Sequence, residues 1–389
     1  MNWSLSIGKI FGIPVKLHVS FILAIPLFAW LIGRDVELTA RLIEGFFNAA
    51  AGIFGFLPTI TIDTSLVAVA MNPYVVGVVV ALGLFFGVFI HELAHCLLAL
   101  RHGIKIHSIT LLILGGVSSI EDDLPDPRHE LPMALAGPLT SLGLGLLFWI
   151  LAYGVYAAAL SPAVAGASLF VLGYLALLNI MLFLFNLIPA FPMDGGRVLR
   201  AFLATRMPLA RATKLAADIG KGFAVLMGIA GVLLVFNPIL IIIAFFIYIG
   251  ADQESMMVRY NVLLKDLRVT DVMTRDVLTV PPATTVPELI RMMYATKHLA
   301  FPVVDQGALV GLVTLDDVHR TPEIDRDAKQ VKDIMTRTLV TLPPDALLTA
   351  AFRLMTQQGI GRIPIVEGST LAGIVTRTDI LRVMELREA

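Results

Sequence analysis

Two histidines and a glutamate form the pattern with the clearest chemistry in this sequence. His91 and His95 are four residues apart, and Glu92 directly follows the first histidine. On a helix, residues at this spacing lie on one face about one turn apart, so both imidazoles can reach a single ion. The HExxH pattern is typical of a zinc site in which two histidines bind the metal and the glutamate takes a proton from the attacking water.

These three residues lie at the end of a long apolar stretch. The 27 residues from Thr64 to Ile90 carry no formal charge, and His91, Glu92 and His95 follow directly. Ionisable side chains in a spanning helix are costly and indicate a functional site. The alternative is a buried His–Glu pair that only holds helices together. The metal-ligand spacing favours the metal site.

The composition indicates a membrane protein with a soluble part. Of the 389 residues, 57% are hydrophobic and 15% are charged, and the mean hydropathy is +0.84; a soluble domain carries roughly 25% charged residues. The net charge of −1 argues neither for nor against nucleic-acid binding, but the sequence shows no basic patch of the kind that binding to duplex DNA needs, so no nucleic-acid partner is expected. Cys96 is the only cysteine, so no intrachain disulfide is expected, and we interpret it as a small apolar side chain beside His95.

Uncharged apolar stretches predict about six transmembrane helices. They are residues 17–33, 72–100, a helix that begins near 131, residues 166–187, and two helices within 222–251 that Asn237 and Pro238 divide. Arg34 follows the first stretch without a cleavage site, so we interpret it as a spanning helix and not a removable signal. Residues 45–62 contain Gly, Asn and Pro and favour an interfacial or re-entrant segment. The β-branched residues of 104–123 predict a membrane-embedded β-hairpin.

The basic residues predict how the helices are oriented. Lys9 and Lys16 precede the first helix, and a larger basic cluster separates the fourth and fifth predicted helices: Arg197, Arg200, Arg206, Arg211, Lys214 and Lys221. Basic residues favour the cytoplasmic side of a membrane. With six spans, both termini of a multi-pass cell-membrane protein are then cytoplasmic.

A zinc ion held by two histidines needs a third protein ligand, with the fourth position left for water. The segment NLIPAFPMDGGR, residues 186–197, supplies Asn186 and Asp194 at the end of the fourth predicted helix. Asp194 is followed by Gly195 and Gly196, which let the backbone approach other groups closely. The alternative is that Asp194 caps the helix that follows.

The C-terminal third contains an internal repeat with a period of 62 residues and no gaps. Asp271 to Arg275 returns as Asp333 to Arg337, and GLVTLDD at 311–317 returns as GIVTRTD at 373–379. Such a repeat indicates two packed copies of one supersecondary unit, each predicted as strand, helix, strand, strand, helix. We therefore expect a membrane domain at 1–257 and two repeats at 258–324 and 325–389.

The membrane motifs resemble the site-2 protease family of intramembrane zinc metalloproteases. The resemblance rests on HELAH at 91–95, AGP at 136–138 and NLIPAFPMDGG at 186–196. It implies that His91, His95 and Asp194 bind zinc, that Glu92 is the general base, and that Asn186 lines the active site. Gly115, Gly116 and Val117 match the membrane-embedded strand region of the family, where an exposed strand edge can pair with an unwound substrate segment.

The two repeats resemble a tandem pair of cystathionine-β-synthase (CBS) motifs. That resemblance implies a cleft for an adenine nucleotide such as ATP, contacted by two Thr–Asp pairs: Thr314 with Asp317, and Thr376 with Asp379. A purely structural pair, or one that forms a homodimer, is the alternative.

Together these observations predict an α-helical polytopic membrane domain with a soluble α+β tandem domain. The expected function is an intramembrane zinc metalloendopeptidase that cleaves transmembrane segments of protein substrates in the lipid bilayer, in regulated intramembrane proteolysis modulated by an adenine nucleotide. The alternatives are a membrane transporter gated by its repeats and a catalytically silent, nucleotide-sensing scaffold. A transporter would be expected to show repeats in its membrane part, and it leaves HELAH and Asp194 unexplained.

Overall fold

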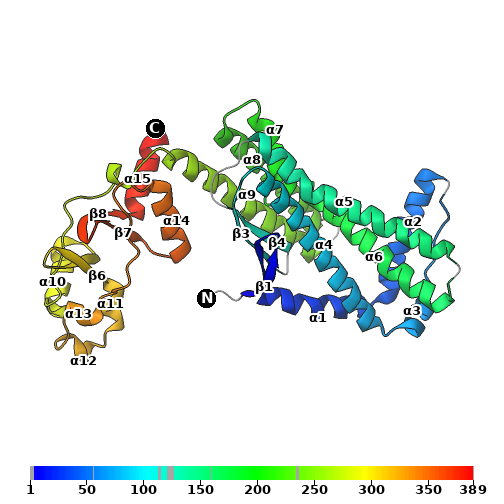
Figure 1. Ribbon diagram of the computed structural model, residues 1–389, viewed down its shortest axis with the longest axis horizontal. Helices are drawn as coiled ribbons and strands as arrows, with labels where there is room; N and C mark the ends of the chain where they lie inside the picture. Colours follow the sequence, from blue (N-terminus) through cyan, green and yellow to red (C-terminus); the bar gives the residue numbers. More distant parts are fainter. Residues whose placement is uncertain are drawn as a thin grey trace. The chain divides into compact units, whose positions relative to one another are not determined.

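The computed structural model describes residues 4–388 except 56, 113–114, 121–126, 159 and 234–235. The chain forms two compact units, Met1–Ser255 and Met256–Ala389 (Figure 1). The first is mostly helical and the second combines a sheet with short helices.

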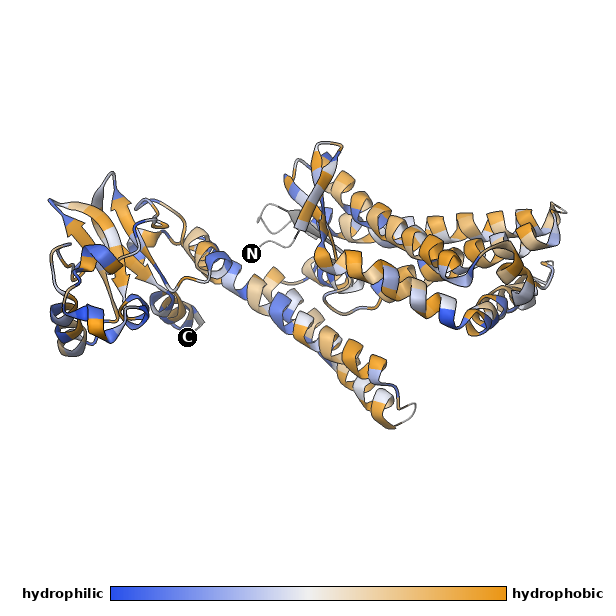
Figure 2. Ribbon diagram, turned by 90° about the horizontal axis from the view of Figure 1, so that it is seen from below, coloured by the Kyte–Doolittle hydropathy of each residue, from blue (hydrophilic) through white to orange (hydrophobic). Residues whose placement is uncertain are grey.

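Long apolar helices dominate the first unit, and Figure 2 shows their hydrophobic residues along most of their length. In chain order the helices that begin in this unit are α1 (Val19–Arg34), α2 (Val36–Phe54), α3 (Thr64–Ala70), α4 (Pro73–Arg101), α5 (Pro127–Ala157), α6 (Pro162–Asn186), α7 (Asp194–Ala204), α8 (Leu209–Leu233) and α9 (Pro238–Leu264). Among the described residues, α4, α5, α6, α8 and α9 are the five helices long and apolar enough to cross a membrane. The prediction of a polytopic helical domain is confirmed.

The first predicted span is more complex than a single helix. α1 and α2 are long and apolar enough to cross a membrane only when taken together, and the two helices are bent by 84° relative to each other. After α2 the chain turns back along it: the side-chain amide of Asn48 accepts a hydrogen bond from the Ile60 N–H and donates one to the Ile60 carbonyl. Counting the bent pair as one span gives six spans, the number predicted from the sequence.

Two predicted helix boundaries were wrong. α8 begins at Leu209, well before residue 222, and α9 continues as a helix to Leu264, well beyond residue 251. The uncharged run marks only the most apolar part of this helix pair. Before it, α8 is amphipathic and buries Ala212, Ala216 and Ala217, so packing extends the helix beyond its uncharged part.

The predicted hairpin is part of a larger sheet. Its strands β3 (Ile106–Leu112) and β4 (Gly115–Ile120) are antiparallel, and Leu112 pairs with Gly115. The N-terminal residues, for which we predicted no strands, form β1 (Ser4–Ile10) and β2 (Ile13–His18), and the sheet order is β1-β2-β3-β4. Strand β2 pairs parallel to β3. Ile109 and Leu111 of β3 pack with the buried Cys96 of α4, so the sheet is fixed against the helix that carries the two histidines.

The second unit repeats one motif twice. Its sheet has the order β5-β6-β8-β7, with β5 (Ala300–Asp305) and β6 (Ala308–Thr314) in the first copy and β7 (Arg362–Glu367) and β8 (Thr370–Thr376) in the second. The helices are α10 (Val286–Thr296), α11 (Leu315–Arg320), α12 (Glu323–Arg326), α13 (Val331–Ile334), α14 (Leu348–Gln358) and α15 (Arg377–Glu388), with a short 3-10 helix at Val269–Asp271.

The strand predicted at the start of each copy is reduced to an isolated bridge, Val280 with Val303 and Leu342 with Ile365. The two copies also exchange contacts: Thr274 pairs with Ile374 of β8, and Thr336 pairs with Leu312 of β6. The prediction of a packed α+β repeat pair is confirmed.

Candidate metal centre

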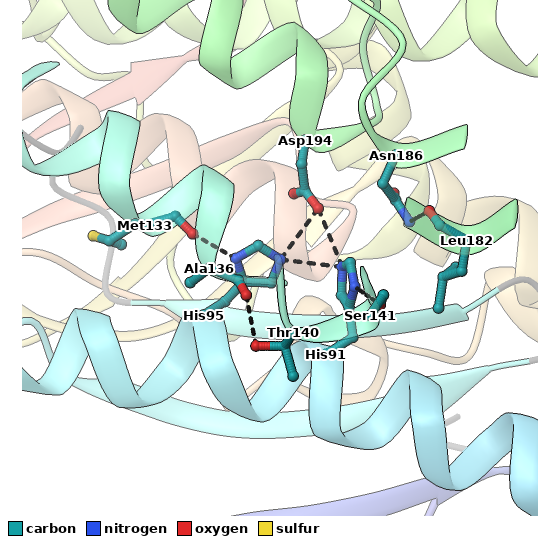
Figure 3. Close-up of polar contacts among 9 residues, drawn as sticks. All are labelled: His91, His95, Met133, Ala136, Thr140, Ser141, Leu182, Asn186 and Asp194. Atoms are coloured by element: carbon teal, nitrogen blue, oxygen red, sulfur yellow. Dashed lines mark hydrogen bonds and ion pairs between the residues drawn. The ribbon is translucent and has the colours of Figure 1, made fainter. Parts of the chain in front are cut away.

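Three side chains from two helices point at one another in the first unit (Figure 3). α4 presents His91 and His95 on one face, and Asp194 lies in the first turn of α7. The Asp194 Oδ2 atom is 3.1 Å from His91 Nε2 and 3.2 Å from His95 Nε2, and the two Nε2 atoms are 3.2 Å apart. Among the described residues, these three form the one group of His, Cys, Asp and Glu side chains spaced to hold a metal ion.

Helix α5 holds the opposite nitrogen of each imidazole. His91 Nδ1 lies 2.8 Å from the Ser141 hydroxyl, and His95 Nδ1 lies 2.7 Å from the Met133 carbonyl. A carbonyl can only accept, so Nδ1 of His95 carries a proton and donates it to Met133. Metal-binding histidines typically use their second nitrogen in this way. Both imidazoles are therefore oriented with Nε2 toward the common point.

The spacing of the three atoms fits zinc. Zinc–nitrogen bonds of about 2.0–2.1 Å in a tetrahedral site give ligand-to-ligand distances of about 3.3–3.4 Å, close to the observed separations. Space beside the ligands is kept by Gly137 of α5, where a Cβ would lie 2.6 Å from His91 Nε2 and still closer to His95 Nε2. The residues present thus fit a bound zinc ion.

The environment of Asp194 supports a ligand and argues against a helix cap. Met193 is the residue at the N-cap position of α7, and Asp194 is the first residue of the helix. Burial alone would raise the pKa of the Asp194 carboxyl, but hydrogen bonds with His91 and His95 hold it well below its ordinary value. The carboxylate therefore stays ionised, which is the form that binds a metal. The capping alternative was wrong.

Glu92 lies against strand β4. A Cβ on Gly116 would lie 2.8 Å from the Glu92 Cδ atom, so only a glycine lets the strand pass this close to the carboxylate. Gly115 and Gly116 belong to the described part of β4, whereas the side chain of Val117 lies outside the described residues. The glutamate and the proposed substrate strand are therefore neighbours.

Asn186, predicted to line the active site, lies at the end of the helix that precedes Asp194. It is the last residue of α6, and its side-chain amide donates a 3.0 Å hydrogen bond to the Leu182 carbonyl of the same helix. Figure 3 shows it beside Asp194 with its NH₂ group directed at that carbonyl. Its predicted role in the active site stays a prediction.

Sequence reasoning missed the contributions of α5. Ser141, Met133 and Gly137 contact the histidines, yet the only signal in the sequence was the AGP motif, which carries no indication of which helix it faces. Their roles depend on how α5 packs against α4.

In the second unit, both predicted Thr–Asp pairs form capping boxes. The Thr314 hydroxyl donates to Asp317 Oδ2 at 2.7 Å, and the Thr376 hydroxyl donates to Asp379 Oδ2 at 2.7 Å. A cavity of about 450 Å³ lies at the first pair and is also lined by Asp316, Arg320 and Arg362, but not by Thr376 or Asp379. Burial lowers the pKa of the Arg362 guanidinium, and the charge of Asp316 acts in the opposite direction.

Comparisons with known proteins agree with these features. Peptidase family M50 matches residues 79–161 and 154–229, and the CBS domain matches residues 269–322 and 331–386. A zinc metalloprotease of Methanocaldococcus jannaschii is 34% identical over 388 residues, which cover 100% of this chain and 98% of that protein. Rip3 of Mycobacterium tuberculosis is 30% identical over 399 residues, covering 99% of this chain and 94% of its own length. Among solved structures, the site-2 protease from Methanocaldococcus jannaschii is 35% identical, covers 65% of this chain and 95% of its own, and has a TM-score of 0.41.

The helical fold and these motifs define a zinc metalloprotease in a membrane protein. The chain belongs to the M50 zinc metalloproteases, because the family model matches its membrane part and a zinc metalloprotease is 34% identical to it over its full length. It also carries a C-terminal pair of CBS domains. The resemblance identified from the sequence is confirmed.

Proposed function

We propose that the chain is an intramembrane endopeptidase whose zinc ion is held by His91, His95 and Asp194. The observation that carries the proposal is the convergence of His91 Nε2, His95 Nε2 and Asp194 Oδ2 within 3.2 Å of one another. Both imidazoles are held by α5 through their Nδ1 atoms, which leaves their Nε2 atoms directed at Asp194. When bound, zinc polarises the scissile carbonyl and lowers the pKa of the attacking water.

The chain's own residues carry the proton transfers. Glu92 is the general base: it takes the proton of the attacking water and returns it to the leaving amine. Its packing against Gly116 fixes the carboxylate next to β4. Ser141 and the Met133 carbonyl hold the Nδ1 atoms of the two imidazoles, which keeps the Nε2 atoms directed at the metal position. Asn186 reaches the substrate or the developing oxyanion after its hydrogen bond to Leu182 is exchanged.

The proposed substrate is a transmembrane segment unwound at the site. Among the described strands, β4 pairs only with β3, so its second edge offers backbone groups to an extended peptide. A helix hides its peptide bonds in its own hydrogen bonds, and β-pairing with Gly115, Gly116 and Val117 compensates for their loss. Because Glu92 contacts this strand, a peptide paired there lies near the base.

Two variants test the mechanism with purified full-length protein and single-span substrates. Glu92→Gln is expected to retain about one zinc ion and to lose about 10³-fold in cleavage rate, since a positioned base contributes about 10²–10⁴-fold. Asp194→Ala is expected to lose both zinc and activity. Cleavage at the wild-type rate by Glu92→Gln contradicts the assigned base, and full zinc occupancy in Asp194→Ala places the third ligand elsewhere.

We further propose that both termini are cytoplasmic. The basic residues between α6 and α8 support this orientation. A cysteine introduced beside Arg206 is expected to react with a membrane-impermeant thiol reagent only after cells are opened. Reaction in intact cells would contradict the orientation.

We also propose that the CBS pair binds an adenine nucleotide, and that binding alters the cleavage rate. The cavity at Thr314 and Asp317 supports this, because carboxylates suit a ribose and Arg320 with Arg362 suit a phosphate. The nucleotide can act only by favouring one arrangement of the pair over another. Homodimer formation through the same domains is part of the proposal.

For the nucleotide, ATP is titrated against the full-length protein by calorimetry while cleavage is monitored. Asp317→Ala combined with Asp379→Ala is expected to abolish the response and leave zinc content unchanged. Absence of heat and of any change in rate at millimolar ATP would reduce the pair to an assembly module.

A further inference from the structure

A buried ion cluster lies close to the metal centre and plays no part in the mechanism above. Arg200 of α7 is 4% exposed. Its Nε atom donates to Glu130 Oε1 at 2.8 Å, its Nη2 atom contacts the same oxygen, and its Nη1 atom donates to Glu254 Oε1 at 2.6 Å. The cluster therefore joins the start of α5, the middle of α7 and the second half of α9, all within the first unit.

Stability alone is a weak explanation for this cluster. Moving an arginine and two carboxylates out of water costs several kcal/mol for each ion, and the attraction between them roughly offsets that cost, so hydrophobic side chains often serve as well. Buried ions are better explained where they fix one particular arrangement. Here the arrangement to be fixed is that of α5, α7 and α9, the three elements that Arg200 joins.

Two of those elements lead directly to the metal centre. Glu130 lies one turn before Met133, whose carbonyl holds His95. Arg200 lies on the same short helix as Asp194, and its guanidinium stacks 5.1 Å from the centre of the Phe191 ring. Phe191 belongs to the loop between α6 and α7 and is 1% exposed. A Cβ on Gly196 would lie 2.6 Å from its backbone nitrogen, so the loop packs tightly against the start of α7. The arginine thus holds both ends of the segment that presents Asp194.

The third element, α9, touches the same loop. A Cβ on Gly250 would lie 2.6 Å from Pro192 Cδ, and Glu254 lies one turn further along the helix. The Glu254 side chain is 30% exposed, whereas those of Arg200 and Glu130 are each 5% exposed. Glu254 is therefore the partner that can separate from the cluster at the least cost in desolvation.

We propose that Arg200 is a positioning residue for the third metal ligand, Asp194. We further propose that the ion pair between Glu254 and Arg200 makes the position of Asp194 depend on the position of α9. This inference rests on the proposed assignment of Asp194 as a ligand. Metal ligands bind well only when their geometry is held closely by the surrounding residues. Loosening the cluster therefore weakens zinc binding without removing any ligand.

The test measures zinc affinity by chelator competition in the full-length protein, well below its unfolding temperature. Arg200→Lys keeps the charge but loses the two-pronged guanidinium, and is expected to lower zinc affinity about tenfold, whereas Glu254→Ala is expected to lower it about threefold. The matched control is Asp252→Ala on the same helix, which breaks a 2.5 Å contact with Lys221 of α8 and touches no part of the cluster. Its zinc affinity is expected to remain at the wild-type value even where its unfolding temperature falls.

Several outcomes overturn the inference. Wild-type zinc affinity in both cluster variants, or an equal loss in Asp252→Ala, means that Arg200 serves the fold alone. If Arg200→Lys fails to fold, Glu254→Ala against Asp252→Ala decides the question. Asp194→Ala separates this inference from the proposal beneath it: retained zinc there refutes the ligand assignment, whereas lost zinc with unaffected cluster variants refutes only the role of Arg200.

Discussion

The metal centre and the Thr–Asp pairs of the repeats use polar side chains in opposite ways. In the metal centre, Ser141 and the Met133 carbonyl hold only one nitrogen of each imidazole, and the other nitrogen is directed at Asp194. In the repeats, Thr314 and Asp317 satisfy each other as a helix cap, and so do their counterparts 62 residues later. A motif with a structural task of its own is weaker evidence for a ligand than one whose lone pairs converge on a point.

The largest effect is expected from a single methyl group in the metal centre. Gly137→Ala places a Cβ against both Nε2 atoms and should reduce zinc affinity and cleavage about 100-fold or more. Gly143→Ala is the control on the same helix, because a Cβ there meets nothing within 4 Å. Zinc content by atomic absorption and cleavage of a single-span substrate measure both. A Gly137→Ala protein with wild-type activity would mean that the metal does not lie between these atoms.

A methyl group on the neighbouring strand should separate chemistry from metal binding. Gly116→Ala displaces the Glu92 side chain, and we expect cleavage to fall about 10–100-fold while zinc remains bound. Loss of zinc together with activity would show that the strand shapes the metal centre itself. Strand β4 would then be one of the elements that hold the metal.

The support behind the imidazoles should have a smaller effect. Ser141→Ala removes the partner of His91 Nδ1 and is expected to lower zinc affinity about tenfold in chelator competition. Thr140→Val is the matched control, because its hydroxyl bonds only to the Ala136 carbonyl of its own helix. Equal losses in the two variants would attribute the effect to α5 packing.

The smallest effect is expected in the repeats. Thr314→Val and Thr376→Val each remove one helix cap and should destabilise the soluble unit by about 1 kcal/mol, by the same amount in each copy. Thermal unfolding of the soluble unit in the full-length protein measures this. A clearly larger loss at one copy would show that its Thr–Asp pair does more than cap a helix.

How much could be predicted depended on whether the signal was local. The spacing of His91 and His95, and the break that Asp194 makes in an apolar run, are visible along the chain, and the structure brings these residues together. The pairing of β2 with β3 joins residues nearly 100 positions apart, and β2 is short and carries Pro14 and Lys16, so no local pattern indicated it. Partners such as Ser141 depend on helix packing and were missed for the same reason.

Arg200 illustrates a different failure. The sequence analysis counted it among the basic residues that orient the helices, yet it is buried between Glu130 and Glu254. A charge in the sequence says nothing of whether it faces water or a carboxylate from another helix. The other basic residues between α6 and α8 still support the proposed orientation.

Cys96 has a practical consequence for measurement. It is the only sulfhydryl in the chain and is 0% exposed, packed between α4 and the sheet. Spin labels or fluorophores can therefore be attached at pairs of introduced surface cysteines while the native cysteine is kept. One pair that joins α9 to the loop before α7, and a second within the repeat pair, would report distances while nucleotide is added.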